Sequence, residues 1–409
     1  MPHRTRRVSC TTKKLPYRNS MPYNFNITPN RRDPNILNKW TLYPKDVLPL
    51  WIADMDFPVA PSIQAALHKQ VEHGVLGYEL PSKPLYNAIA ARMKKLYDWD
   101  IDPDWIVYSA GVNNGYIIAA RILCSPQKGY LIQTPVYNEF QEMVDKTGFR
   151  QHVAPLEKMV EGNRIRYEVD FEAFEREIRK VGMFLLCHPH NPVGKIFSPF
   201  ELKRMAEICI ENDVTIVSDE IHSELLLGGA TFTPLARMSS EIERHTITLV
   251  SASKAFNVPG LTCAFAIIPD KVLRKRFYHV AYGMSFEIST PGLTAARVAY
   301  SGKADAWLRA LRRYLTGNRD LIIEYVKENM SGMRLTIPDA TYLLWMDCSE
   351  LHLKPSPYEF FLKEAKVAFS DGGKFGKGSE QFVRFNFGTS RKWVMEGLER
   401  MRKALNKNL

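Results

Sequence analysis

The stretch Thr246-Ile-Thr-Leu-Val-Ser-Ala-Ser-Lys254 decides the fold, because it reads as a short buried strand that leads into a lysine. Two earlier stretches have the same form. Met183-Phe-Leu-Leu-Cys187 leads into a turn with Asn191, and Val214-Thr-Ile-Val217 ends at Asp219. Short apolar strands that alternate with amphipathic segments predict an α/β fold with a large, mostly parallel sheet and helices on both faces.

The polar residues after these strands predict one site. In open α/β sheets, ligands bind beyond the carboxyl ends of the strands, which is where Asn191, Asp219 and Lys254 fall. A lysine in such a place can lose its proton and add to a carbonyl group, although a lone lysine is more often a solvated surface charge. An aspartate there can pair with a basic ring nitrogen or cap the next segment.

The rest of the chain divides by pattern. Residues 199–212 and 304–329 place apolar side chains at helical spacing. We expect residues 21–60 to form an N-terminal arm and part of a small domain. Residues 61–300 form the expected large, cofactor-binding domain, and residues 301–409 a smaller C-terminal domain of mixed strands and helices.

Composition limits the classes of function. Of the 409 residues, 45% are hydrophobic and 24% are charged, which is typical of a globular enzyme. The six cysteines include no Cys-x-x-Cys pair, which argues against a disulfide framework and favours a cytoplasmic location. No apolar run approaches the roughly 20 residues that span a bilayer, so we expect no membrane association.

The net charge of +11 makes a nucleic-acid binder one alternative class. Residues 1–18 contain six basic residues and no acid, so this segment supplies more than half of the excess. We expect residues 1–20 to be a disordered basic extension ahead of a true start at Met21. A mitochondrial or plastid presequence is the alternative interpretation of the segment. No nucleic-acid partner is expected.

Two other motifs do not predict sites. His188-Pro-His190 has the form of a metal-binding pair, but no third ligand stands near it, so no metal site is predicted. Gly194-Lys195 lacks the upstream glycine and the following Ser or Thr of a phosphate-binding P-loop.

Four motifs in a fixed order carry a resemblance to a known family. They are His190-Asn191-Pro192-Val193-Gly194, Ser218-Asp219-Glu220-Ile221-His222, Ser251-x-Ser-Lys254-x-Phe-Asn257 and Gly260-Leu261. In this order they resemble the fold-type-I enzymes of aminotransferase class I/II, from residue 21 to about 405. The resemblance implies pyridoxal 5′-phosphate (PLP) as cofactor, a second, smaller α+β domain, and a homodimer with shared active sites.

The resemblance also implies a role for each matching residue. Lys254 would carry PLP as a Schiff base and act as the catalytic residue, and Asp219 would pair with the pyridine nitrogen. Arg384 would bind the carboxylate of an amino-acid substrate. The other implied cofactor contacts are Gly111, Val112, Asn113, Tyr137, Asn191, His222, Ser251, Ser253 and Tyr78 of the partner subunit. The other implied substrate contacts are Ala53 and Asn191.

Alternative interpretations remain for three of these residues. Tyr137 and Tyr78 have the alternative of plain core aromatics, and Arg384 has that of a surface ion-pair partner.

Three further motifs resemble the MalY/PatB-type cystathionine β-lyase (C–S lyase) branch of the superfamily. They are Leu50-Trp-Ile-Ala-Asp-Met-Asp-Phe-Pro58, His73-Gly-Val-Leu-Gly-Tyr78 and Ala340-Thr-Tyr-Leu-Leu-Trp-Met-Asp-Cys348. Thr262 also stands where typical aminotransferases have a phosphate-binding arginine. The resemblance implies α,β-elimination on cystathionine or a cysteine S-conjugate, which yields a thiol, pyruvate and ammonia.

Two other functions remain open. A PLP-dependent aminotransferase of an unusual amino acid is the first, and a catalytically silent protein of the same fold is the second. The chain departs from the branch at Asn113-Asn114-Gly115 and at Thr389-Ser390-Arg391. These departures leave the cofactor assignment intact and concern the identity of the substrate.

Overall fold

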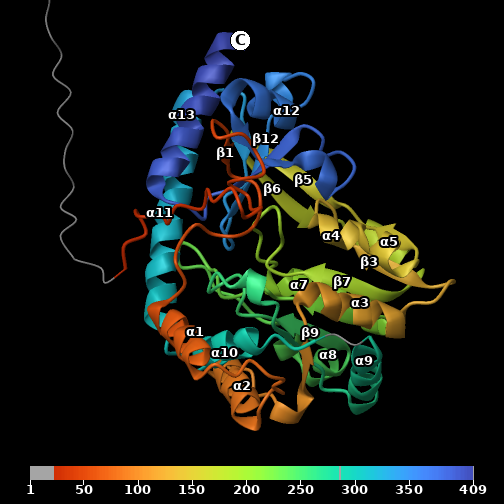
Figure 1. Cartoon of the computed structure of the whole chain (residues 1–409). Coiled ribbons are helices and arrows are strands. Elements are labelled where there is room, and N and C mark those ends of the chain that lie inside the picture. The colour runs from red at the N-terminus through yellow and green to blue at the C-terminus, as the bar shows by residue number, and fades with distance from the viewer. Residues whose placement is uncertain (1–22, 285–286, 409) are drawn as a thin grey trace, which may run out of the picture.

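The computed structural model describes residues 23–284 and 287–408. The predicted basic extension, residues 1–20, lies outside them. The described residues form two large β-sheets and one two-stranded sheet, with helices packed around them (Figure 1). The helices are α1 (Pro61–His73), α2 (Lys83–Tyr97), α3 (Val112–Leu123), α4 (Asn138–Gln141), α5 (Met143–Thr147), α6 (Phe171–Ile178), α7 (Pro199–Glu211), α8 (Ser240–Arg244), α9 (Lys271–Gly283), α10 (Thr290–Tyr300), α11 (Asp305–Asn329), α12 (Pro357–Phe360) and α13 (Arg391–Asn408).

A seven-stranded sheet forms the centre of the larger part. In spatial order its strands are β2 (Ile106–Ser109), β10 (Ala264–Ile267), β9 (Thr246–Val250), β8 (Thr215–Asp219), β7 (Val181–Cys187), β3 (Gly129–Ile132) and β4 (Gln151–Val153). The strands from β9 to β4 pair in parallel, and β10 is antiparallel to both of its neighbours. The predicted mostly parallel sheet is therefore confirmed. Thr262 precedes β10 and has a left-handed backbone with φ 40°.

Helices cover both faces of this sheet, as β7 illustrates. Successive side chains of a strand point to opposite faces. Phe184 and Leu186 accordingly pack in the hydrophobic layer that contains the buried faces of α6 and α7. Met183 and Leu185 pack on the opposite face with the buried side chains of α3 and α9. This two-sided burial explains why the strand reads as an unbroken apolar run.

A six-stranded sheet forms the second part of the molecule. Its order is β14 (Ser370–Asp371), β15 (Phe382–Asn386), β12 (Leu343–Asp347), β11 (Arg334–Leu335), β6 (Arg164–Val169) and β5 (Leu156–Glu161). Figure 1 shows the long helix α11 beside α13 along one edge of the molecule. The hairpin β5–β6 comes from within residues 61–300, so the two sheets do not divide along the chain at one point. The predicted domain boundaries stay a prediction.

The N-terminal segment lies against the C-terminal part of the chain. Strand β1 (Leu48–Pro49) pairs in parallel with β13 (Val367–Ala368), and the red and blue ends of the ribbon meet there in Figure 1. The segment that follows β1 then passes between the two sheets, where it carries part of the site. Among the described residues, no helix has the length and apolarity needed to cross a membrane.

Candidate active site

A cavity of about 300 Å³ lies at the carboxyl edge of the central sheet. Its lining residues are Ala53, Ala110, Gly111, Val112, Asn113, Tyr137, Cys187, Asn191, Asp219, Ile221, His222, Ser251, Ser253, Lys254, Pro259, Thr262 and Cys263. The parallel strands β7, β8 and β9 end side by side, which brings Asn191, Asp219 and Lys254 together as the strand pattern predicts. With the exception of Tyr78 and Arg384, every residue implied for the site by the resemblance lines this cavity.

Lys254 sits in the loop after β9, with its ammonium nitrogen turned toward the N-terminal segment. Lys254 Nζ donates a hydrogen bond of 2.8 Å to the carbonyl oxygen of Ala53. Burial, followed by the nearby Arg384 guanidinium, lowers the pKa of Lys254 to about 8. An amine with this pKa exchanges protons near neutrality, which an ordinary surface lysine does not.

Asp219 ends β8 as a buried carboxyl group. Its Oδ1 accepts a hydrogen bond of 3.1 Å from the backbone N–H of Ile221. Burial raises the pKa of Asp219 to about 7, while the Ile221 N–H and Lys254 act in the opposite direction. A buried acid of this kind is stabilised in its charged form by a cationic partner, and a protonated ring nitrogen is such a partner.

His222 follows two residues after the Asp219–Glu220 pair and is also buried. Burial, followed by the charges of Lys254 and Arg384, lowers the pKa of His222 well below its usual value. The ring is therefore neutral at physiological pH. Within the described part of the chain, its Nδ1 is buried without a hydrogen-bond partner.

The N-terminus of α3 forms one wall of the cavity. Gly111 precedes the helix with φ 108°, a backbone conformation that glycine adopts without strain. No described side chain caps this helix end, and Val112 and Asn113 line the cavity, so the first N–H groups of the helix can serve as donors for an anion. Ser251 and Ser253 also line the cavity. The Ser251 hydroxyl donates a hydrogen bond of 2.6 Å to the Cys263 carbonyl.

Arg384 reaches the site from β15 of the second sheet. Its Nη1 donates to Asn191 Oδ1 at 3.0 Å, and its Nη2 donates to the Trp51 carbonyl at 3.1 Å and to Ser370 Oγ at 3.0 Å. The guanidinium lies over the Phe375 ring, 4.8 Å from the ring centroid. These contacts use three of the five N–H donors of an arginine, and Arg384 Nε is buried without a partner among the described residues.

A second cavity of about 610 Å³ adjoins the first and is lined by Arg384. The two cavities share Ala53, Tyr137, Lys254 and Pro259. Lys254 and Tyr137 thus stand between a chamber with an anion-binding wall and a wider chamber with a buried cation. Burial raises the pKa of Tyr137 to about 12, so the phenol stays protonated.

Tyr78 lies apart from both cavities. It belongs to the segment between α1 and α2 and is 96% exposed. Its predicted contact from a partner subunit is not tested in a single chain and stays a prediction.

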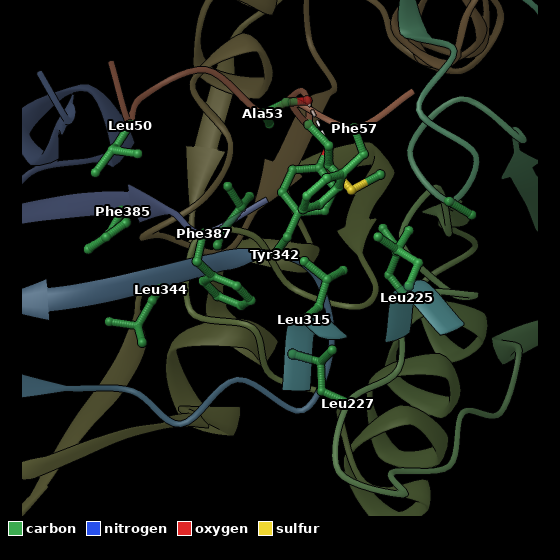
Figure 2. Packing of buried hydrophobic residues seen from close by; sticks show 14 of the residues in the cluster. Leu50, Ala53, Phe57, Leu225, Leu227, Leu315, Tyr342, Leu344, Phe385 and Phe387 are labelled. Carbon is green, nitrogen blue, oxygen red and sulfur yellow. Dashed lines mark hydrogen bonds between the residues drawn. The ribbon is translucent and has the colours of Figure 1, made fainter. Parts of the chain in front are cut away.

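Tyr342 is a further residue at the site, and the sequence motifs do not predict a role for it. Its hydroxyl donates a hydrogen bond of 2.8 Å to the same Ala53 carbonyl that accepts from Lys254 (Figure 2). Tyr342 belongs to the motif Ala340–Cys348, so the motif was visible, although its contact with the site was not. Within the described ranges, no cluster of His, Cys, Asp and Glu side chains forms a candidate metal site.

Comparisons with known proteins agree with this geometry. The family described as "Aminotransferase class I and II" matches residues 45–401. Cystathionine beta-lyase PatB of Bacillus subtilis is 35% identical over 373 residues, which cover 88% of this chain and 93% of that protein. Two solved structures that contain PLP are also similar. Cystalysin of Treponema denticola has a TM-score of 0.89 and 29% identity, covering 95% of this chain and 100% of the other. The C–S lyase of Staphylococcus hominis has a TM-score of 0.87 and 28% identity, covering 94% and 99%.

The residues of the first cavity fit PLP. The helix end at Gly111 suits a phosphate, the unpaired carboxyl of Asp219 suits a ring nitrogen, and the amine of Lys254 suits an aldehyde. Arg384 holds Asn191 Oδ1, which leaves the amide Nδ2 of Asn191 free to donate to a phenolic oxygen.

Proposed function

This chain belongs to the aminotransferase class I and II family, and from that premise we propose that it is a PLP-dependent C–S β-lyase. Its substrate is cystathionine or another cysteine S-conjugate, which it converts to a thiol, pyruvate and ammonia. The likeness to PatB over 93% of that protein's length carries the choice of reaction. The geometry of the joined cavities supports the cofactor and the amino-acid class of the substrate.

The residues of the first cavity would hold the cofactor. When bound, PLP supplies an electron sink for a carbanion at the substrate Cα. Asp219 would stabilise the positive charge on the ring nitrogen, and Tyr137 would lie against the ring. The N–H groups at the start of α3 would hold the phosphate, together with the Ser253 hydroxyl.

Arg384 orients the substrate. Two of its N–H groups, one on Nε and one on Nη1, have no partner among the described residues and are available to a carboxylate. A buried guanidinium without an acidic partner favours an anionic ligand. Substrate bound in this way lies in the wider cavity, with its Cα toward Lys254, which lines both cavities.

Lys254 acts as the base. Its depressed pKa allows the free amine to take the proton from Cα at Nζ. The C–S bond at Cβ then breaks, and the sulfur leaves as a thiol after it gains a proton. Hydrolysis of the remaining three-carbon unit gives pyruvate and ammonia.

The test of reaction type is a comparison of two assays on the pure protein. Cystathionine or an S-alkyl cysteine, given alone, is expected to yield pyruvate and ammonia in equal amounts over many turnovers. An amino acid with a keto acid is expected to exchange amino groups far more slowly. The reverse order of rates would replace the lyase by the alternative, an aminotransferase of an unusual amino acid, which uses the same residues.

We also propose that the chain acts as a homodimer. The segment around Tyr78 exposes several apolar side chains, which a partner subunit would cover. They are Val71, Val75, Leu76 and Leu80, each more than 60% exposed.

The five cysteines of the described part are free thiols, which supports a cytoplasmic location.

A further inference from the structure

The segment Trp51–Phe57 is held from both sheets. From the large part, Asn257 accepts from the Met55 N–H at 3.0 Å and donates to the Phe57 carbonyl at 2.8 Å. From the second sheet, Asn386 Nδ2 donates to the carbonyls of Ile52 and Asp54 at 2.5 and 2.7 Å. The backbone of this segment is therefore fixed at both ends.

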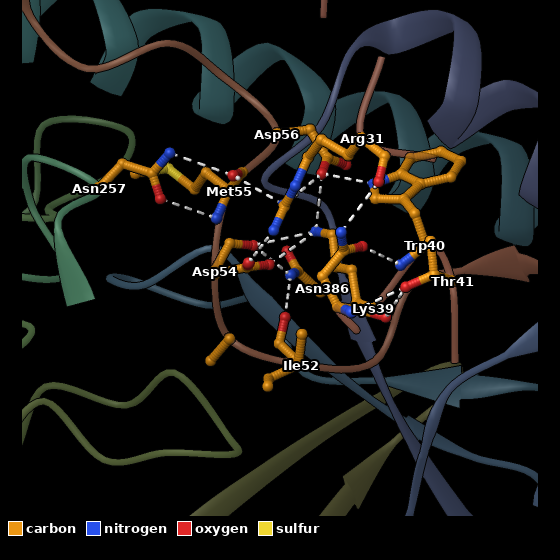
Figure 3. A network of polar contacts seen from close by, with 12 residues as sticks. Arg31, Lys39, Trp40, Thr41, Ile52, Asp54, Met55, Asp56, Asn257 and Asn386 are labelled. Atoms are coloured by element: carbon orange, nitrogen blue, oxygen red, sulfur yellow. Dashed lines mark hydrogen bonds and ion pairs between the residues drawn. The ribbon is translucent and has the colours of Figure 1, made fainter. Parts of the chain in front are cut away.

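Two acidic side chains of the segment form ion pairs with two basic side chains that precede it in the chain (Figure 3). We call Arg31, Lys39, Asp54 and Asp56 the four-charge cluster. Lys39 Nζ lies 2.9 Å from Asp54 Oδ1 and 3.0 Å from Asp56 Oδ1. Arg31 lies 2.7 Å from Asp54 Oδ2 and 2.9 Å from Asp56 Oδ1. Lys39 and Asp56 are 4% and 2% exposed, so the pairing is far less screened than on the surface.

The same segment also contacts Lys254. The Ala53 carbonyl accepts from Lys254 Nζ, and Asp54 lines the wider cavity with Lys254. The other charged or titratable groups that act on Lys254 are Arg384 and Asp219, and His222 is neutral beside them. Asp54 therefore connects the four-charge cluster to the field at Lys254 Nζ.

We propose that the four-charge cluster is a positioning device for Lys254. It holds the Ala53 carbonyl against Nζ, and the balance of its two cations and two anions sets how readily that nitrogen is protonated. Arg31 and Lys39 offset part of the negative charge of Asp54, so Asp54 favours a proton on Lys254 less than an unpaired carboxylate would. This inference rests on the proposed attachment of PLP at Lys254 and is independent of the choice between elimination and transamination.

The signs of two substitutions follow from Coulomb's law. Asp54→Asn removes an anion near Nζ, so the positive form of that nitrogen loses stability and its pKa falls. Lys39→Met removes a buried cation, so Asp54 is less compensated and the pKa rises. One charge near a partly buried group shifts a pKa by about 0.5 to 1 unit. If the cluster only stabilised the fold, the two substitutions would not be expected to shift the pKa of Lys254 in opposite directions.

The experiment is a pH titration of the visible absorption of the PLP-loaded protein, whose chromophore includes Lys254 Nζ. We expect the midpoint to fall by about 0.5 to 1 pH unit in Asp54→Asn and to rise by a similar amount in Lys39→Met. The double variant Asp54→Asn/Lys39→Met removes one charge of each sign and is expected to return toward the wild-type midpoint. Lys94→Met and Asp100→Asn are the matched controls and leave the midpoint unchanged, because they alter an exposed ion pair between α2 and the residues that follow it.

Unchanged midpoints, or shifts of the same sign in both single variants, overturn the proposal. If Lys39→Met does not fold, Asp54→Asn decides alone, since only a fall of the midpoint agrees with the proposal. A covalent PLP adduct that borohydride still traps in the Lys254→Ala variant would instead refute the attachment at Lys254. In that case the proposed function fails together with this inference. Unchanged midpoints with PLP attached at Lys254 would refute this inference alone.

Discussion

A hydrogen bond of 3.0 Å from Arg384 Nη1 to Asn191 Oδ1 joins the two sheets of the molecule at the site. Arg384 lies on β15 of the second sheet, and Asn191 lies in the loop after β7 of the central sheet. The contact fixes the amide of Asn191 with its donor side free. It also couples the group proposed to bind substrate to a group proposed to bind PLP.

We expect Arg384→Lys to lower kcat/KM by about 10- to 1,000-fold, since a lysine keeps the charge but loses the planar fork. PLP content should stay near that of the wild type, because Asn191 remains in place. Steady-state kinetics and cofactor absorbance check both expectations. Arg391→Lys is the matched control, because Arg391 stacks on Tyr314, 5.4 Å from the ring centroid, and lines neither cavity. Loss of PLP with unchanged substrate affinity would reverse the assignment.

Lys254→Ala should remove the absorption band of the lysine-bound cofactor and the covalent adduct that borohydride traps, because the only amine that lines the first cavity within the described residues is gone. Turnover should fall by at least about 100- to 10,000-fold, the range for loss of a general base. Peptide mapping of the reduced wild-type protein should place the adduct on Lys254. Lys195→Ala, whose ammonium pairs with Glu201 elsewhere, is the control and should keep both signals. An adduct on another lysine would contradict the prediction.

The stability of the PLP-free protein should depend on Asp219 and on pH. Burial raises the pKa of Asp219 to about 7, so the folded state holds a proton that the unfolded chain loses near pH 4. The ionisation of this group therefore removes stability as the pH rises from about 4 to 7, and the loss is complete above 7. Asp219→Asn should abolish this loss and stabilise the PLP-free protein at pH 8 by about 2–4 kcal/mol relative to wild type.

Thermal unfolding of both proteins at pH 5 and pH 8 checks this expectation. The advantage of Asp219→Asn should be larger at pH 8 than at pH 5. With PLP bound the order should reverse, since the asparagine cannot stabilise a charged ring nitrogen. Equal differences at the two pH values would show that Asp219 does not titrate in this range.

Tyr78→Phe should weaken PLP retention by about 1–2 kcal/mol, the scale of one hydrogen bond to a charged group. Equilibrium dialysis of the cofactor measures the effect. Tyr282→Phe, at a tyrosine that is 79% exposed, is the control and should bind PLP as the wild type does. Size-exclusion chromatography with light scattering should give a dimer for all three proteins, and an active monomer would refute the shared site.

Much of the site was predictable from local sequence. Lys254, Asp219 and Asn191 follow three apolar strands that are adjacent and parallel in the sheet, so their order along the chain already places them at one edge. Gly111 lies directly before α3 with φ 108°. Glycine is favoured at such a position because it adopts a positive φ without strain.

The second sheet was less predictable. Its strands come from residues 156–169 and from residues 334–386, and no local pattern states that β6 pairs with β11. Pairing between segments so far apart depends on which apolar faces meet in the folded chain, and no single segment determines that by itself.

The sequence by itself determined the α/β architecture, the family and the residues at the strand ends, because each follows from periodicity or from a motif within a few residues. Only the tertiary structure decided which groups act on those residues. The Ala53 carbonyl lies 201 and 289 positions along the chain from Lys254 and Tyr342, the two residues that donate to it. Lys39 pairs with Asp54 next to this carbonyl, in the same N-terminal segment. Contacts of this kind arise from packing three distant segments into one volume, and the physical reason is that burial and charge compensation act through space and not along the chain.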